Sequence, residues 1–251
     1  MKTTIVIAAA AFSTALALAP VASAATTLAA DWEMNESYSA TEMQQNDTVM
    51  VDSAGDHDGT IPAWQGTPSG TQQIKTNGSY YTRVNHCPAC APAEPSRVIS
   101  VPDAADGSLD IPDPTVPYTL EFRFRTTHGF GNYMQKGHDT SKGGQIKIQG
   151  PKGSVQCLFK GANGVRVGTG TASKFPPLDD GQWHTIKCVH TATQVKEYVD
   201  GATRAIVKNG STGPIDNTAD WTVGGKNNCD QGKITCDYFA GDIDYIKVSH
   251  G

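Results

Sequence analysis

The sequence has no long apolar run beyond its first residues. Residues 5–19 are mostly apolar, but no later segment approaches the roughly 18 consecutive apolar residues that a membrane-spanning helix requires. The first stretch is itself short, follows Lys2, and precedes the small residues 22–24, a pattern typical of a signal peptide with its cleavage site. We therefore predict a signal peptide over residues 1–24 and export of a soluble mature protein, residues 25–251, without a membrane span.

Positive charge is also scarce. Lys and Arg number 20 against 25 Asp and Glu, which gives a formal net charge of −5. Nucleic-acid binding depends on a basic footprint, so this balance argues against a nucleic-acid partner. Aromatic residues make up 8% and charged residues 18%, whereas the chain has 26 Gly and 14 Pro, a balance that favours short strands joined by turns.

A helical hydrophobic period is missing from the mature chain, and alternating segments take its place. The segments YTLEFRFRT, from Tyr118, and GQIKIQG, from Gly144, both alternate between apolar and polar side chains, as half-buried strands do. The segment QVKEYVDGATRAIV predicts a hairpin that turns at Asp200 and Gly201. Many short alternating strands predict an all-β sandwich or barrel.

Two further regions complete the predicted strand pattern. The proline-rich region 67–117 is the least regular, and we expect strands near residues 79–84 and 97–101 within it. The segment FAGDIDYIKVS closes the chain as a strand. Its alternation places Ile243, Tyr245 and Lys247 on one face and Asp242, Asp244, Ile246 and Val248 on the other.

All six cysteines lie after the predicted signal peptide. An even number in an exported chain favours disulfides, and local order suggests the pairs Cys87–Cys90, Cys157–Cys188 and Cys229–Cys236. The segment CPAC also fits part of a redox or zinc motif. A redox motif would require a βαβ unit around it, and a zinc site would require a second cysteine pair at a matching spacing. The sequence shows neither.

Several segments together resemble a known family. DWEMNE and MVDSAGDHDGTI near the start, DGQWHTIKC and VKEYVDG in the second half, and FAGDIDYIKV at the end resemble laminin G-like domains of the concanavalin A-like lectin/glucanase superfamily, in the same order. The resemblance implies one domain over residues 25–251, folded as a jelly-roll sandwich of two antiparallel sheets. It also implies a carbohydrate- or protein-binding role.

The histidines in DGQWHTIKCVH are predicted to be structural. At a period of two, His184, Ile186, Cys188 and His190 share one strand face. A face that carries an aliphatic residue and a disulfide cysteine is a poor metal site, and the two histidines stand roughly 20 Å apart along an extended strand.

The superfamily that the chain resembles includes enzymes, so hydrolysis and polysaccharide elimination are both considered as activities of this chain. Hydrolysis by paired carboxylates is not expected: Asp31 and Glu33 lack a third acid at the required spacing. The resemblance implies a structural role for an acid at the position of Asp242 and Asp244. A lyase that acts on a uronate-containing polysaccharide is the better rival. Its candidate catalytic residues are Arg123, Arg125, Lys147 and Tyr245. The expected function remains a non-catalytic, lectin-like module, with the lyase and an extracellular protein-contact domain as alternatives.

Two kinds of ligand site are predicted for an extracellular polysaccharide or glycan. A cationic, amide-rich strip would bind an anionic glycan through guanidinium and amide groups. Its residues are Arg123, Arg125, Gln145, Lys147 and Gln149. A neutral sugar would instead use aromatic platforms with amides in loops, for which Tyr133, Trp221, Asn227 and Asn228 are candidates, whereas Trp32 and Trp183 are predicted to serve the core.

Calcium is the one cofactor that the sequence suggests. Asp52, Asp56 and Asp58 do not complete an EF-hand pattern, and Asp52 is predicted to cap a turn. A different calcium site could join the first and last strands, and its ligands would be Asp31, Asp242 and Asp244.

Overall fold

The computed structural model describes residues 25–34, 48–61, 71–76, 79–84, 99–170, 175–203, 205–225, 239 and 241–251. The predicted signal peptide, the pairs Cys87–Cys90 and Cys229–Cys236, and the loop residues Asn227 and Asn228 lie outside these residues. The regular structure in the described ranges consists of β-strands. This part of the chain contains no helix long and apolar enough to cross a membrane.

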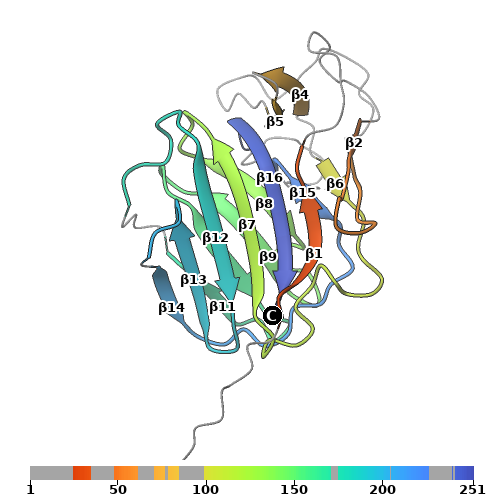
Figure 1. Ribbon diagram of the computed structural model, residues 1–251. Helices are drawn as coiled ribbons and strands as arrows, with labels where there is room; N and C mark the ends of the chain where they lie inside the picture. The colour runs from red at the N-terminus through yellow and green to blue at the C-terminus, as the bar shows by residue number, and fades with distance from the viewer. Residues whose placement is uncertain are drawn as a thin grey trace, which may run out of the picture.

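The strands form two antiparallel sheets (Figure 1). Sheet A has the order β14 (Ile206–Asn209), β13 (Gln194–Val199), β12 (His184–His190), β7 (Tyr118–Arg125), β16 (Gly241–His250), β5 (Ser79–Val84) and β4 (Thr71–Thr76), and β1 (Thr27–Trp32) also pairs with β16. Sheet B has the order β11 (Arg166–Gly168), β10 (Gln156–Lys160), β9 (Gln145–Gly150), β8 (Gly131–Lys136), β15 (Trp221–Val223), β6 (Ile99–Val101), β3 (Gly59–Ile61) and β2 (Thr48–Met50). The strands expected near residues 79–84 and 97–101 are confirmed as β5 and β6.

The two sheets pack face to face around the apolar side of each strand. On β7, Leu120, Phe122 and Phe124 are completely buried, and on β9 the inward residues are Ile146 and Ile148. The buried side chains of both sheets form one hydrophobic cluster. The prediction of a two-sheet antiparallel jelly-roll sandwich is confirmed.

A disulfide joins the two sheets through this cluster. Cys157 lies on β10 of sheet B and Cys188 on β12 of sheet A, with their Cα atoms 5.8 Å apart. Both residues are fully buried. The predicted pairing of Cys157 with Cys188 is therefore confirmed.

The hairpin β13–β14 turns where the sequence predicts. Asp200 and Gly201 both adopt positive φ angles, 50° and 66°, which a type I′ turn requires and which Asp-Gly tolerates. Gly201 would be the harder residue to replace, because an added side chain raises the energy of the left-handed conformation.

The segment after β2 is organised by Asp52. Its Oδ1 accepts hydrogen bonds from the backbone N–H groups of Asp31, at 2.8 Å, and Ala54, at 3.0 Å. Its Oδ2 accepts one from the N–H of His57 at 3.2 Å. The predicted turn-capping role of Asp52 is confirmed, and the carboxylate additionally ties this turn to β1.

The alternation predicted for the last strand is wrong in part, because β16 contains a bulge. The pairing register with β7 shifts between Ile243 and Tyr245. Ile243 therefore points into the core together with Ile246 and Val248, whereas Asp244 and Tyr245 are both half-buried on the outer side. A bulge adds one residue to a strand and changes the phase of every residue beyond it.

Candidate functional site

A groove lies on the outer face of sheet B. Because β9 directs its isoleucines inward, Gln145, Lys147 and Gln149 point outward. In the strand register, Lys147 lies between Gln135 of β8 and Leu158 of β10. The groove has a volume of about 770 Å³ and is lined by Gln135, His138, Asp139, Thr140, Gln145, Lys147, Gln149, Gln156, Leu158 and Arg166.

The amide groups of the groove are held in place by hydrogen bonds. Gln149 Nε2 donates to Gln156 Oε1 at 2.5 Å, and Gln135 Nε2 donates to the carbonyl oxygen of Gly137 at 2.6 Å. Gln135 Oε1 in turn accepts from Asn132 Nδ2 at 3.0 Å. A side-chain amide has two donor hydrogens and an acceptor oxygen, so these bonds orient the amides and leave capacity for a ligand.

The rim of the groove carries an ionic cluster. Asp139 accepts hydrogen bonds from Arg166 and from Lys160, and these bonds, Arg166 first, lower the pKa of the Asp139 carboxyl group. Among the described lining residues, Lys147 and Arg166 are positively charged, and Asp139 is the one carboxylate. The groove has a positive balance in a protein whose net charge is −5.

The predicted cationic strip does not assemble, because its residues lie on different sheets. Gln145, Lys147 and Gln149 line the groove on sheet B, whereas Arg123 and Arg125 point outward from β7 of sheet A. Along both strands, buried and outward side chains alternate. The outward side chains of β7 and of β9 lie on opposite sides of the sandwich. The strip is therefore corrected to two separate surfaces.

Each arginine of β7 is already paired. Arg123 Nη1 lies 2.6 Å from Asp244 Oδ2, and Arg125 Nε lies 2.6 Å from Asp242 Oδ2. Both guanidinium groups also stand over the ring of Trp183, at 4.8 and 4.9 Å from its centroid. Trp183 is half-buried on the outer side of sheet A, so its predicted core role is wrong, whereas Trp32 is buried as predicted.

The four lyase candidates do not converge on one site. Tyr245 lies opposite Arg123 on sheet A, and its hydroxyl donates to Glu121 Oε1 at 2.9 Å. Burial, followed by this hydrogen bond, raises the pKa of Tyr245 to about 12. Lys147 lies on the other sheet, so the combination predicted for β-elimination is divided between two faces.

Two predicted aromatic platforms are core residues. Tyr133 is 3% exposed, and its ring packs against Phe124 at 4.8 Å between centroids. A register shift between Asn132 and Met134 turns it inward. Trp221 is 2% exposed, and its Nε1 donates to a backbone carbonyl oxygen at 3.3 Å. Neither ring presents a face to a sugar.

The three predicted calcium ligands are each paired with a different cation. Asp31 Oδ2 lies 2.8 Å from Lys247 Nζ, and Asp242 and Asp244 bind the two arginines described above. Within the described ranges, no three His, Cys, Asp or Glu side chains form a group that could hold a metal ion. The predicted convergence of these carboxylates on one ion is therefore corrected to three ion pairs.

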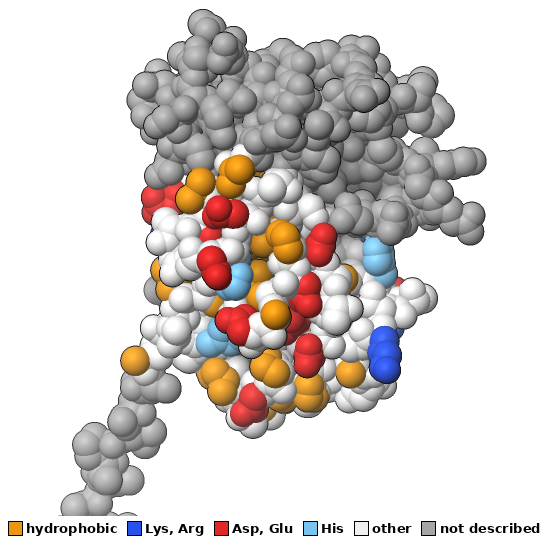
Figure 2. Space-filling model, turned by 90° about the vertical axis from the view of Figure 1, so that its right-hand side faces the viewer, with side chains coloured by type: hydrophobic (Ala, Val, Ile, Leu, Met, Phe, Trp, Pro, Cys, Tyr) orange, Lys and Arg blue, Asp and Glu red, His pale blue; other side chains and the backbone are white. Residues whose placement is uncertain are grey.

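A second hollow, of about 380 Å³, lies at the edge of the sandwich between residues 56–58 and 102–106. Its lining includes four aspartates: Asp56, Asp58, Asp103 and Asp106. Figure 2 shows, on the described part of one side of the molecule, several Asp and Glu side chains, with Lys and Arg at one margin. The edge thus contrasts in charge with the groove on sheet B.

His184 occupies a structural position, as predicted. Its Nδ1 lies 2.8 Å from Asp200 Oδ2, and its Nε2 lies 3.0 Å from Asp180 Oδ1. Burial alone would lower the pKa of the ring, but the hydrogen bonds to Asp200 and Asp180 outweigh it and raise the pKa. The ring therefore links the start of β12 to the hairpin turn.

We expect His184 to stabilise the fold most at low pH. Because its folded-state pKa is raised, its contribution is fully present below the unfolded value and is lost as the pH rises through the folded pKa. Replacement by glutamine should lower the free energy of unfolding more at about pH 5.5 than at about pH 9, measured by urea titration. An equal loss at both pH values would contradict this assignment.

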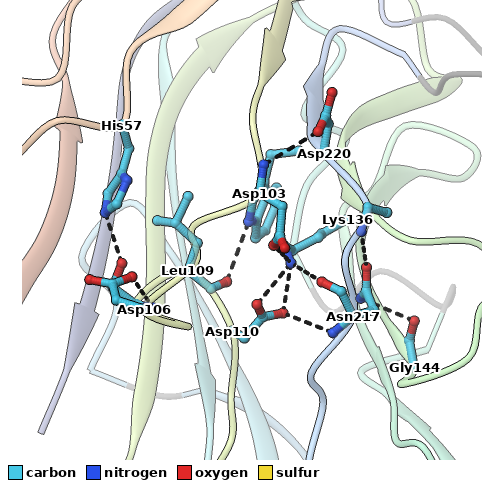
Figure 3. A network of polar contacts seen from close by, with 12 residues as sticks. His57, Asp103, Asp106, Leu109, Asp110, Lys136, Gly144, Asn217 and Asp220 are labelled. Atoms are coloured by element: carbon cyan, nitrogen blue, oxygen red, sulfur yellow. Dashed lines mark hydrogen bonds and ion pairs between the residues drawn. The ribbon is translucent and has the colours of Figure 1, made fainter.

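One buried lysine was not predicted from the sequence. Lys136 has no exposed surface, and its Nζ contacts Asp103, Asp110 and the backbone carbonyl oxygen of Asn217 (Figure 3). Met134 two residues earlier is also buried, so Lys136 stands at an inward position of the strand. The segment GNYMQK does not alternate between apolar and polar residues, so its sequence gave no signal that this lysine would be buried.

Comparison with known proteins identifies the family. Residues 100–251 match the family described as the concanavalin A-like lectin/glucanases superfamily. The chain therefore belongs to this superfamily. No curated protein matches the chain.

Solved structures share the fold at low sequence identity. The chain is similar to domain 4 of AbnA, a GH43 extracellular arabinanase from Geobacillus stearothermophilus solved in complex with arabinotriose, with a TM-score of 0.56 and 16% identity over 90% of this chain and 93% of that one. It is also similar to the binding domain of botulinum neurotoxin serotype D/C, with a TM-score of 0.53 and 10% identity over 89% of this chain and 48% of that one. The toxin domain is thus about twice as long as the matching part. Laminin G-like domains and a disulfide are typical of extracellular proteins.

Proposed function

We propose that this chain is a secreted, non-catalytic carbohydrate-binding module and that the groove on sheet B is its glycan site. The observation that carries the proposal is the row of oriented amides, Gln145, Gln149 and Gln156, around Lys147 in a groove of about 770 Å³. Amides and a lysine offer the donors and acceptors that match sugar hydroxyl groups and ring oxygens, and few well-placed polar groups fix a ligand's orientation.

The charges of the groove favour binding over hydrolysis. Cleavage by paired carboxylates needs two acids that face each other across the glycosidic bond. Asp139 is the one carboxylate among the described lining residues, and it is engaged by Arg166 and Lys160. The arabinotriose bound to the similar arabinanase domain makes arabinan a reasonable member of the first ligand panel.

The experiment combines retention and turnover. Mature protein is incubated with insoluble neutral and uronate-containing polysaccharides, bound protein is measured after sedimentation, and the supernatant is followed for the ultraviolet absorbance of unsaturated sugars. Retention without new absorbance is the expected result. Rising absorbance on a uronate polymer would replace the non-catalytic proposal with a lyase, and the absence of retention on every polymer would favour a protein-contact domain.

Variants of the groove give the sharper test. Lys147→Gln is expected to weaken binding to a retained glycan about tenfold, the effect of losing one hydrogen bond from a charged donor. Lys187→Gln is the matched control, because Lys187 is exposed on the outer face of sheet A, away from the groove. Both variants should unfold at the same urea concentration as the wild type. Equal affinities of the two variants would place the glycan elsewhere.

A further inference from the structure

Lys136 lies in direct contact with two carboxyl groups inside the sandwich (Figure 3). Its Nζ is 2.9 and 2.8 Å from Oδ1 and Oδ2 of Asp110 and 2.6 Å from Oδ1 of Asp103. Lys136 is 0% exposed and Asp110 is 1% exposed. An amine and a carboxyl group are thus held at contact distance, with a second carboxyl group touching the same amine.

The surroundings of this group are largely apolar. Trp221 is the neighbour of Lys136 on β15, and Asp110 stands between Leu109 and Ile111, all three of them buried. Water has little access to the contact, and burial of charged groups in such surroundings is unfavourable.

The number of charges also does not balance. One ammonium group faces two carboxylates, so the cluster would be left with a buried negative charge if all three were ionised. Burial raises the pKa of the Asp110 carboxyl group, Asp103 adds to this effect, and the contacts with Lys136 oppose it. Protonation of Asp110 is therefore easier than protonation of an exposed aspartate, and Asp103, with 25% of its side chain exposed, is the second carboxyl group in contact with the amine.

We propose that Lys136 and Asp110 condense to an intramolecular isopeptide bond and that Asp103 carries the protons. Asp103 removes a proton from the ammonium group, and the lone pair of Nζ attacks Cγ of Asp110 to form the new C–N bond. Asp103 then delivers its proton to the departing hydroxyl oxygen while the nitrogen loses its second proton to the same carboxylate. The C–O bond breaks, one water molecule leaves, and the amide remains. The balance requires no oxidant or co-reactant.

The proposed bond would have a structural role. It would join β8 to the segment between β6 and β7, which are otherwise held together by ionic contacts at this point. It would also replace a buried ammonium–carboxylate pair by a neutral amide, which removes the cost of burying both charges.

The mass of the intact protein tests the proposal directly. After reduction, the folded wild-type chain is expected to weigh about 18 Da less than its sequence predicts, the mass of one water molecule. A peptide map should show the peptides of Asp110 and Lys136 linked, without tryptic cleavage after Lys136. A full mass for the folded wild type would overturn the proposal.

Controls separate this bond from other losses of water. The four Asp-Gly pairs, at residues 58–59, 106–107, 180–181 and 200–201, can lose water as succinimides. Hydroxylamine cleaves a succinimide and leaves an isopeptide intact, so a loss that hydroxylamine abolishes would also overturn the proposal. Lys136→Arg and Asp103→Asn should restore the full mass, whereas Lys147→Arg should keep the loss. If the first two variants do not fold, the wild-type peptide map still decides.

Discussion

Replacement of Lys136 by methionine is expected to lower the free energy of unfolding by about 3–5 kcal/mol. The substitution keeps the length of the side chain but removes the cation that faces Asp103 and Asp110. Removing one partner of a buried ion pair leaves the other charged group desolvated, and this penalty exceeds the value of the contact itself. Urea unfolding followed by tryptophan fluorescence measures the loss. In chains that carry the proposed covalent bond, the substitution removes that cross-link in place of the ion pair, and the stability again falls.

A second substitution tests the cause of this loss. In the double variant Lys136→Met/Asp110→Leu, the buried ion pair is replaced by apolar side chains, so much of the lost stability should return. Lys147→Met is the matched control, because Lys147 is half-buried in the groove and should change stability little. A Lys136→Met variant as stable as Lys147→Met would show that the network is not a stabilising element.

Replacement of Cys157 and Cys188 by alanine is expected to cost about 3–4 kcal/mol, the entropic effect of opening a loop of 31 residues. The bond restricts the unfolded chain, and both sulfur atoms also fill space in the core between the sheets. Wild type unfolded in urea with a reducing agent should approach the stability of the double variant. The double variant should respond less than the wild type to the reducing agent, because it keeps only the predicted pairs Cys87–Cys90 and Cys229–Cys236. Equal unfolding midpoints for wild type and variant would contradict this expectation.

The fold could be predicted because its signals are local. Alternation on β7 identifies the buried residues Leu120, Phe122 and Phe124 without any knowledge of their partners. Asp200 and Gly201 can adopt the positive φ angles of a tight hairpin, so the turn can also be predicted from two adjacent residues. The order of the family-like segments then indicated which sandwich these strands would build.

The site was harder to predict because it depends on which sheet each strand joins. Arg123 and Lys147 lie on equally polar strand faces, and nothing in either segment shows that β7 and β9 belong to opposite sheets. Bulges add a second difficulty. One residue gained near Tyr133, and another near Asp244, changes which side chains face outward, and the sequence around them gives no sign of the shift.

The position of β16 has a consequence for how the chain folds. This strand pairs with β7, β1 and β5, and its residue His250 pairs with Thr27 at the other end of the described chain. Sheet A therefore cannot close until the last strand has been synthesised, and pairing over such a sequence distance is slow. The proposed secretion would benefit from this delay, because a chain exported before β16 is in place could cross the membrane unfolded and complete its sandwich afterwards.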